Sequence, residues 1–247
     1  MKNYYGSLCT EMYEILHRKA PQDELAFYLS YAASGMKILE PLCGSGRFLV
    51  PFLRSGFNIF GIDLSGEMLE KLREKAPNAD VVQADICTYL TDERYDYIFV
   101  SSSSISLFTD LSVCKRILST LKDLLSPHGK LVFSVDTLAN RCPNDEEYKT
   151  SVCVKTAQGF DLVLKIQNRY DEKNQIQYSP SIYELYDGAV CLQREQMDFQ
   201  TRLYRFGEME QYLKEIGFLN IKTYSSFEKE IAVKDQCEAF LFECSLN

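Results

Sequence analysis

A glycine-containing loop that follows an acidic residue is the feature of this sequence with the clearest chemical potential. The stretch ILEPLCGSGR (residues 38–47) places Glu40 at the end of an apolar run and Gly44 and Gly46 in the following loop. Glycine lets a backbone approach a ligand closely, and a helix that begins near Arg47 would offer unpaired N–H groups. Such a loop could bind the phosphates of a dinucleotide, those of a nucleoside triphosphate, or a ligand without phosphate.

The two phosphate-binding alternatives fail on the residues present. A dinucleotide loop needs G-x-G-x-x-G/A, and Leu49 stands at the third small position. A triphosphate loop ends in G-K-[ST], whereas Gly46 is followed by Arg47 and Phe48. An acid such as Glu40 would repel a pyrophosphate but suits an ammonium group. S-adenosylmethionine (SAM) has an ammonium group, a carboxylate for the helix end, and no phosphate, so the loop favours SAM.

Two more acids follow where SAM would need them. Asp63 ends the run in GIDLSGEML, and a carboxylate there can accept hydrogen bonds from both ribose hydroxyls. Asp85 in VVQADI can accept one from the adenine amino group, while the Ile86 N–H meets a ring nitrogen. Leu64 and Met68 could pack on the adenine. Each feature alone is weak, but their order along the chain is specific.

The elements that must position these residues form a regular alternation. Strands are expected at 36–40, 57–62, 80–83, 95–100 and 130–135, and helices at 47–55, 65–75 and 111–125, with a turn at 127–129. Alternating strands and helices predict a parallel sheet covered on both faces. In such a sheet the ligand lies beyond the carboxyl ends of the strands. The fourth strand ends in FVSSSS, so Ser101 and Ser102 would line the methionine part of SAM.

Both flanks of this alternation differ from it. Residues 3–19 and 22–33 have helical spacing. From about residue 150 the pattern has period 2, with a strong hairpin signal at Asp187-Gly188, which predicts three or four antiparallel strands. A helix is expected at 208–216 and final strands at 218–225 and 237–244. The antiparallel block is therefore an insert in a doubly wound sheet.

Composition excludes several classes of function. The 247 residues carry a net charge of −8, which argues against nucleic acid as a partner. Nine cysteines are scattered without a C-x-x-C pair, so we expect reduced thiols and no metal site. No apolar run reaches the length of about 18 residues that spans a bilayer, and the N-terminus has no apolar signal region. We expect a cytoplasmic protein without a membrane partner.

At this point the sequence resembles the class I SAM-dependent methyltransferases. The matching pieces are ILEPLCGSGR, GIDLSGEML, VVQADI, YDYIFVSSSSISLF, LLSPHGKLVFSVD and FGEMEQYLKEIGF, within residues 36–136 and 206–244. The resemblance implies an α/β fold: a Rossmann-like, doubly wound, seven-stranded sheet with an antiparallel last strand. Leu42 is a departure, because it stands where the family usually has its first glycine.

The layout is similar to that of small-molecule N-methyltransferases acting on amino sugars or glycine. This implies an N-terminal helical lid (1–35), a SAM-binding domain (36–145 and 206–247) and an antiparallel β insert covering the substrate pocket (146–205). By matching position, Tyr13 and His17 could reach the SAM carboxylate or the substrate. The residues expected to bind SAM are Tyr13, Glu40, Leu42, Cys43, Gly44, Gly46, Arg47, Asp63, Leu64, Met68, Asp85, Ile86, Ser101 and Ser102.

The expected function is methyl transfer from SAM to a small-molecule nitrogen or oxygen by in-line displacement, with S-adenosylhomocysteine (SAH) as product. No nucleophile of the protein is required, but an amine acceptor must lose its proton. The candidates for this are His17 and Asp136, and in the insert Tyr183, Glu195 and Arg202. The alternatives are an RNA or protein methyltransferase and a non-catalytic module that binds SAM or SAH. A homodimer is left open.

Overall fold

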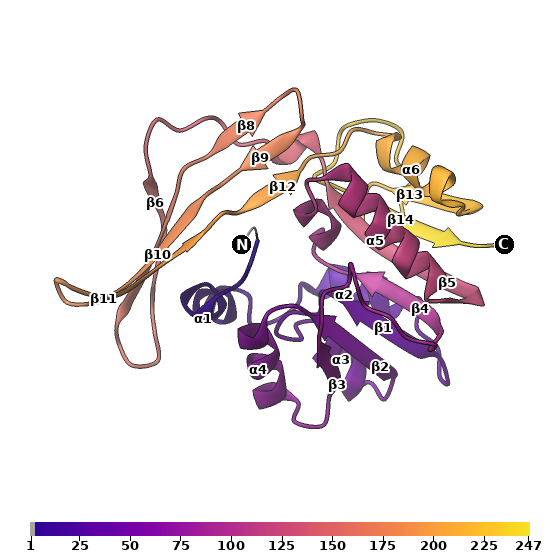
Figure 1. Cartoon of the computed structure of the whole chain (residues 1–247), viewed down its shortest axis with the longest axis horizontal. Helices are drawn as coiled ribbons and strands as arrows, with labels where there is room; N and C mark the ends of the chain where they lie inside the picture. Colours follow the sequence, from indigo (N-terminus) through magenta and orange to yellow (C-terminus); the bar gives the residue numbers. More distant parts are fainter. Residues whose placement is uncertain (1–2) are drawn as a thin grey trace.

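A seven-stranded mixed sheet forms the centre of the computed structural model, which describes residues 3–247 (Figure 1). The strand order is β13-β14-β5-β4-β1-β2-β3. β14 runs antiparallel to both of its neighbours, while β5, β4, β1, β2 and β3 are parallel. The bounds are β1 (Lys37–Pro41), β2 (Asn58–Asp63), β3 (Asp80–Gln83), β4 (Tyr95–Val100), β5 (Leu125–Asp136), β13 (Asn220–Tyr224) and β14 (Ala239–Ser245). The predicted Rossmann-like sheet with an antiparallel last strand is confirmed.

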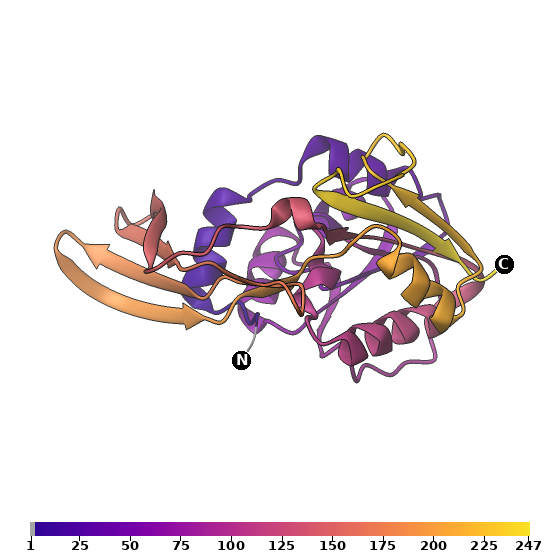
Figure 2. The same ribbon diagram turned by 90° about the horizontal axis from the view of Figure 1, so that it is seen from above.

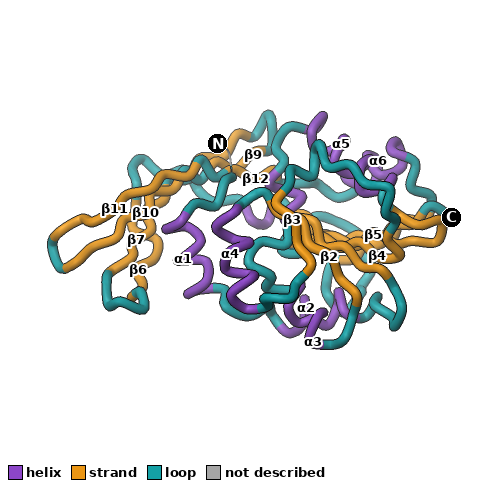
Figure 3. Tube along the Cα trace, turned by 60° about the horizontal axis from the view of Figure 1, so that its bottom comes forward, coloured by secondary structure: helices purple, strands orange, loops and turns teal. Residues whose placement is uncertain are grey.

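Helices cover both faces of this sheet (Figure 3). One apolar cluster joins the sheet to α5 (Leu111–Asp123) and α6 (Glu208–Ile216). A second cluster, on the other face, joins it to α2 (Gln22–Leu29), α3 (Leu49–Arg54) and α4 (Gly66–Lys75). Two short 3-10 helices, η1 (Ser104–Leu107) and η2 (Leu138–Asn140), follow β4 and β5. The strand ends are therefore held between two packed layers, which fixes the loops that follow them.

Local sequence signals explain where these helices begin and end. The Ser65 hydroxyl accepts the Met68 N–H at 3.1 Å and caps α4, as predicted. Asp110 caps α5 through the N–H groups of Ser112 and Val113. α6 ends at Gly217, whose φ of 103° suits glycine. Each cap satisfies groups that the helix itself leaves unpaired.

The turn predicted at 127–129 lies within β5, which begins at Leu125, before the predicted strand. Tyr95 pairs with Leu125 and Tyr97 with Lys130, so residues 126–129 form a bulge in β5 that brings Gly129 close to the Ser126 backbone. A Cβ at Gly129 would lie 2.7 Å from the Tyr95 carbonyl oxygen, so glycine permits this close passage.

The insert contains more strands than the three or four predicted. One sheet has the order β11-β10-β7-β6 and a smaller one the order β12-β9-β8. The strands are β6 (Lys149–Lys155), β7 (Asp161–Ile166), β8 (Arg169–Asp171), β9 (Ile176–Tyr178), β10 (Ser181–Asp187), β11 (Val190–Met197) and β12 (Gln200–Arg202). Short irregular segments divide the long ribbons into these pieces (Figure 1). The hairpin predicted at Asp187-Gly188 is confirmed: Asp187 pairs with Val190, and Gly188 has a φ of 55°.

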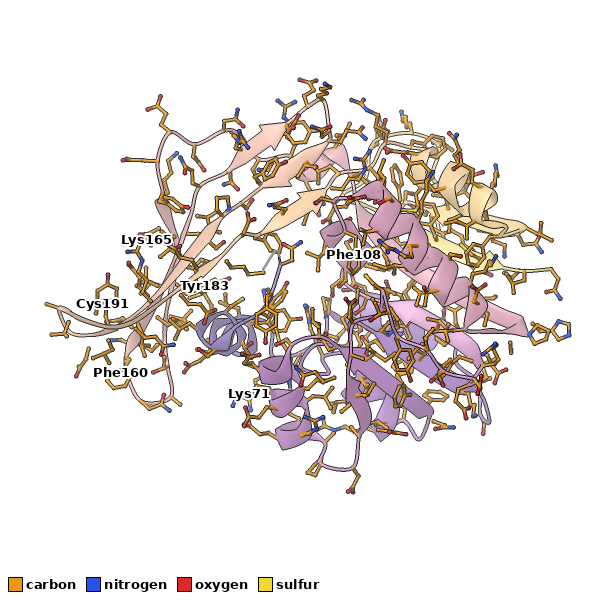
Figure 4. All side chains as sticks on the ribbon, viewed as in Figure 1. Lys71, Phe108, Phe160, Lys165, Tyr183 and Cys191 are labelled. Atoms are coloured by element: carbon orange, nitrogen blue, oxygen red, sulfur yellow. The ribbon has the colours of Figure 1, made fainter. Side chains whose placement is uncertain are left out.

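The N-terminal helix α1 (Ser7–Leu16) is shorter than predicted and lies between the insert and the central sheet (Figures 1 and 2). Its apolar side packs on the insert in a third cluster, in which Leu8 and Met12 meet Leu162 and Tyr183. Figure 4 shows Tyr183 beside α1. We call α1 together with the sheet β11-β10-β7-β6 the cap. Within residues 3–247, no helix is both long and apolar enough to cross a bilayer.

Candidate functional site

A cavity of about 330 Å³ opens at the carboxyl ends of β1, β2 and β4. This is where an open α/β sheet binds its ligand, and the volume is in the range of small-molecule sites. Eleven of the fourteen residues predicted to bind SAM line it: Tyr13, Glu40, Leu42, Cys43, Gly44, Arg47, Asp63, Leu64, Met68, Ser101 and Ser102. Residues from α1, three strand ends and α4 thus face one space.

The loop after β1 passes the cavity with three residues in the left-handed region. Leu42 has a φ of 61°, Gly44 of 52° and Gly46 of 80°. Leu42 therefore adopts the conformation of the glycine that it replaces, at a cost of about 1–2 kcal/mol. A Cβ at Gly44 would meet nothing within 4 Å, whereas one at Gly46 would lie 2.7 Å from Leu72 Cγ of α4. Gly44 leaves room in the cavity, and Gly46 lets the loop pack on a helix.

Glu40 places a carboxylate in the cavity wall. Its side chain is 1% exposed, and its Oε1 accepts a hydrogen bond from the Ser101 hydroxyl at 3.2 Å. Its Oε2 is buried and has no partner among the described residues. Burial raises the pKa of Glu40 well above its usual value, and the carboxyls of Asp63 and Glu24 act in the same direction. A buried, unpaired carboxylate oxygen is costly, so this site fits a ligand that brings a cationic group, such as the SAM ammonium.

Asp63 joins the loop after β1 to the start of α4. Its Oδ2 accepts the Gly44 N–H at 2.7 Å, and its Oδ1 accepts the Ser65 N–H at 2.8 Å. Burial raises the pKa of this carboxyl group. A carboxylate offers about four acceptor positions, so positions remain for the two ribose hydroxyls that the sequence assigns to it.

The last three residues predicted to bind SAM lie outside the cavity lining. Gly46 faces α4, as described. Asp85 is exposed, and its Oδ1 accepts the Cys87 N–H at 2.8 Å, so it organises a turn after β3. Ile86 is 3% exposed and packs in the cluster beneath α5. Asp85 and Ile86 follow the end of β3, as predicted, and their contact with the adenine stays a prediction.

The proton-transfer candidates also lie outside this lining. The His17 ring packs 5.0 Å from the Tyr13 ring, and burial, together with Arg47, lowers its pKa. Burial raises the pKa of Asp136 to about 6, and its Oδ1 accepts a hydrogen bond from Asn140 at 3.2 Å.

The three insert candidates make structural contacts instead. The Tyr183 hydroxyl accepts a hydrogen bond from Cys9 Sγ at 3.3 Å. Glu195 accepts N–H groups at the start of α1. Arg202 pairs with Glu208 of α6 at 2.6 Å. Within residues 3–247, the cavity lining includes none of these side chains.

Sequence reasoning missed the segment before α1, residues 3–6, which we call the strap. Asn3, Tyr4 and Tyr5 line the cavity. The Tyr4 hydroxyl donates to Glu67 at 2.6 Å on one side, and Asn3 Nδ2 donates to the Leu107 carbonyl at 2.8 Å on the other. An extended segment has no periodicity to detect, and the two adjacent tyrosines were the one available signal. The strap is therefore tied to both α4 and the segment after β4 at the edge of the cavity.

A second missed group follows β4. Leu107, Phe108 and Val113 add apolar side chains to the cavity. Before them, Ser102 and Ser103 have φ values of 53° and 52°, and their N–H groups bond Glu24 and Ser134 at 2.8 and 2.9 Å. Consecutive left-handed residues other than glycine are strained, and such strain gathers at functional sites.

Comparison with known proteins identifies the central region of the chain. Residues 38–129 match the family model described as a methyltransferase domain. This stretch is a methyltransferase domain. Over 223 residues, the methyltransferase is 28% identical to a Bacillus subtilis protein, YqeM, that carries a methyltransferase name; the match covers 84% of this chain and 83% of that one.

Solved structures agree with this fold over the whole chain. A SAM-dependent methyltransferase from Clostridium acetobutylicum superposes with a TM-score of 0.78 at 17% identity, covering 96% of each chain. The sugar N-methyltransferase KedS8 from Streptoalloteichus superposes with a TM-score of 0.75 at 17% identity, covering 99% of this chain and 96% of that one. The predictions of a class I fold and of a methyltransferase are confirmed. Two further solved neighbours, at 15% and 20% identity, carry bound SAM.

We expect the raised pKa of Glu40 to make the affinity for SAM depend on pH. A SAM ammonium beside Glu40 selects the ionised carboxylate, so we expect the affinity for SAM to increase as pH rises from about 4.5 through the raised pKa. Without SAM the sign is opposite, because the folded state holds a proton that the unfolded chain releases, and the free energy of unfolding falls over the same range.

Calorimetry of SAM binding across this pH range measures the first effect. Glu40→Gln is the control, because it removes the titrating group and keeps the shape. We expect weaker binding with a flatter pH profile for this variant. An unchanged profile would mean that Glu40 does not meet the ammonium.

Proposed function

We propose that this methyltransferase transfers the methyl group of SAM to a small-molecule acceptor, and that the acceptor atom is an amine nitrogen. The observation that carries the proposal is the lining of the 330 Å³ cavity. Among residues 3–247, the charged side chains in this lining are the carboxyls of Glu40, Asp63 and Asp110 and the guanidinium of Arg47. With Glu40, Asp63 and Arg47 assigned to SAM, the charged side chain left for the acceptor is Asp110, whose carboxylate attracts an amine, whereas a carboxylic acid acceptor would need a cation.

The cofactor would be held by residues from three strand ends and the lid. We assign Glu40 to the ammonium group, Asp63 to the ribose hydroxyls, and Arg47 to the carboxylate. Leu64 and Met68 supply apolar contact for the adenine. When bound, SAM supplies an electrophilic methyl group and leaves as SAH.

The work of the protein is then orientation and exclusion of water. Alignment of donor and acceptor can supply about 7–11 kcal/mol of the barrier reduction. The strap supports this role, because Tyr4 and Asn3 tie it to both sides of the cavity. Such closure also favours a small molecule over RNA or protein, since a polymer would have to pass beneath the strap. The net charge of −8 argues in the same direction.

Incubation with SAM and separate panels of small amines, small carboxylic acids and RNA tests the proposal, with SAH release and product mass as readouts. We expect product from amines. Product from carboxylic acids would move the acceptor to oxygen, and product from RNA would support the polymer alternative. SAM binding without SAH release on any panel would favour the non-catalytic module.

A further inference from the structure

The helix α1 lacks an N-cap side chain of its own. Its N-cap residue is Gly6, which has no side chain to accept an N–H, and the first turn contains no acidic residue. A helix start leaves four N–H groups unpaired and carries a partial positive charge. α1 therefore needs an acceptor from elsewhere in the chain.

Glu195 of β11 provides this acceptor. Its Oε2 accepts the Leu8 N–H at 3.0 Å, and its Oε1 accepts the Cys9 N–H at 3.2 Å. The Ser7 hydroxyl donates to the same carboxylate at 3.3 Å. The fit at Gly6 is close, because a Cβ there would lie 2.7 Å from Glu195 Oε1. A residue of the insert thus does what an N-cap side chain does in an ordinary helix.

The other contacts of α1 are apolar on the side that faces the insert and mainly polar on the side that faces the SAM-binding domain. Toward the insert it buries Leu8 and Met12 in the third apolar cluster. Toward the SAM-binding domain it makes polar contacts, including the pair of Glu14 with Lys75 of α4 at 2.9 Å, and it places Tyr13 in the cavity wall. Polar surface contacts separate more readily than a packed apolar cluster. α1 is therefore bound more firmly to the insert than to the domain that it covers.

We propose that Glu195 is a positioning residue that completes the N-terminus of α1 from the insert and thereby holds Tyr13 and the strap at the cavity. The inference rests on the proposed function, because it concerns how Tyr13 and the strap are held at SAM. Among residues 3–247, the cavity lining includes none from the insert. The insert acts on this site through α1, and the α1 end nearest the strap is the end that Glu195 holds.

Moving the N-cap of α1 from Glu195 to residue 6 tests this proposal. Gly6 has φ −80° and ψ −167°, the extended geometry of an N-cap residue. Glu195→Ala removes the N-cap that the insert provides, whereas Gly6→Ser supplies one within the helix and displaces the Glu195 carboxylate, which is the flexible end of its side chain. We expect Glu195→Ala to be impaired and the double variant to recover, because the serine then occupies the vacated space. Gln193→Ala is the matched control, since Gln193 lies on the same strand and bonds the Ser7 side chain at 3.2 Å instead of the helix backbone.

Two readouts separate the outcomes. Hydrogen exchange at the Leu8 and Cys9 amides should be about fivefold faster in Glu195→Ala, the factor expected for a lost N-cap, and normal in the double variant. The KM for SAM should rise and recover in parallel, with a smaller change in kcat. Unchanged exchange in Glu195→Ala overturns the inference. Recovered exchange without recovered KM overturns it too, because Glu195 would then contact a ligand. If exchange follows the prediction but no variant, nor the unmodified protein, transfers methyl groups, then the proposed function fails and the capping role stands.

Discussion

Gly44→Val is expected to weaken SAM binding by a factor of about 100 or more, which corresponds to about 3 kcal/mol. A Cβ at Gly44 meets no protein atom within 4 Å and therefore projects into the cavity, where the cofactor would approach the loop. The φ of 52° adds a conformational cost for a β-branched residue. Isothermal titration with SAM measures the loss, and Gly44→Ala should fall between the variant and the unmodified protein.

Gly46→Ala is the matched control for this experiment. It also forces a side chain onto a left-handed residue, but its Cβ would lie 2.7 Å from Leu72 Cγ, away from the cavity. We expect it to lower the melting temperature and, in the folded fraction, to leave SAM affinity close to normal. Normal affinity in Gly44→Val would remove this loop from the cofactor site.

Asp63→Ala should weaken SAM binding by about 1.5–3 kcal/mol, a factor of about 10 to 150, because hydrogen bonds to a charged acceptor are lost. The same carboxylate accepts the N–H groups of Gly44 and Ser65, so its removal also releases the loop after β1 from the start of α4. We therefore expect a lower melting temperature without SAM as well.

Asp63→Asn separates these two effects. The amide oxygen can keep one backbone N–H, while the amide group loses the charge and one acceptor. Its melting temperature should fall less than that of Asp63→Ala, and its SAM affinity should lie between those of Asp63→Ala and the unmodified protein. An unchanged dissociation constant in both variants would place the ribose elsewhere.

The part of the site that could be predicted is the part that strand ends create. Glu40 and Asp63 follow buried apolar runs, and parallel strands bring such ends together by geometry alone. Asp85 occupies an equivalent position in the sequence and accepts the Cys87 N–H just as Asp63 accepts the Ser65 N–H, but it lies outside the cavity lining. The sequence does not reveal this difference, since both aspartates lie at or just after a strand end and make the same local hydrogen bond.

The parts that could not be predicted depend on contacts between distant segments. The strap has no periodicity, and Asn3 is placed by the Leu107 and Gln200 carbonyls far along the chain. In the sequence, Glu195 has the same context as a surface acid of a strand, and its contact with the start of α1 becomes evident in the structure. Leu42 adopts the left-handed conformation that its residue type disfavours, because the loop around it determines the backbone.

The small size of the third apolar cluster has a thermal consequence. It is the smallest of the three clusters, and it supplies the apolar contact between α1 and the insert. Regions with few buried apolar contacts open first, so warming should loosen α1 while the central sheet stays folded. Methyl transfer would then decline at temperatures where circular dichroism still reports an intact sheet, and SAM would delay that decline by holding the strap and Tyr13 in place. The working temperature of the enzyme would be set by its cap and not by its core.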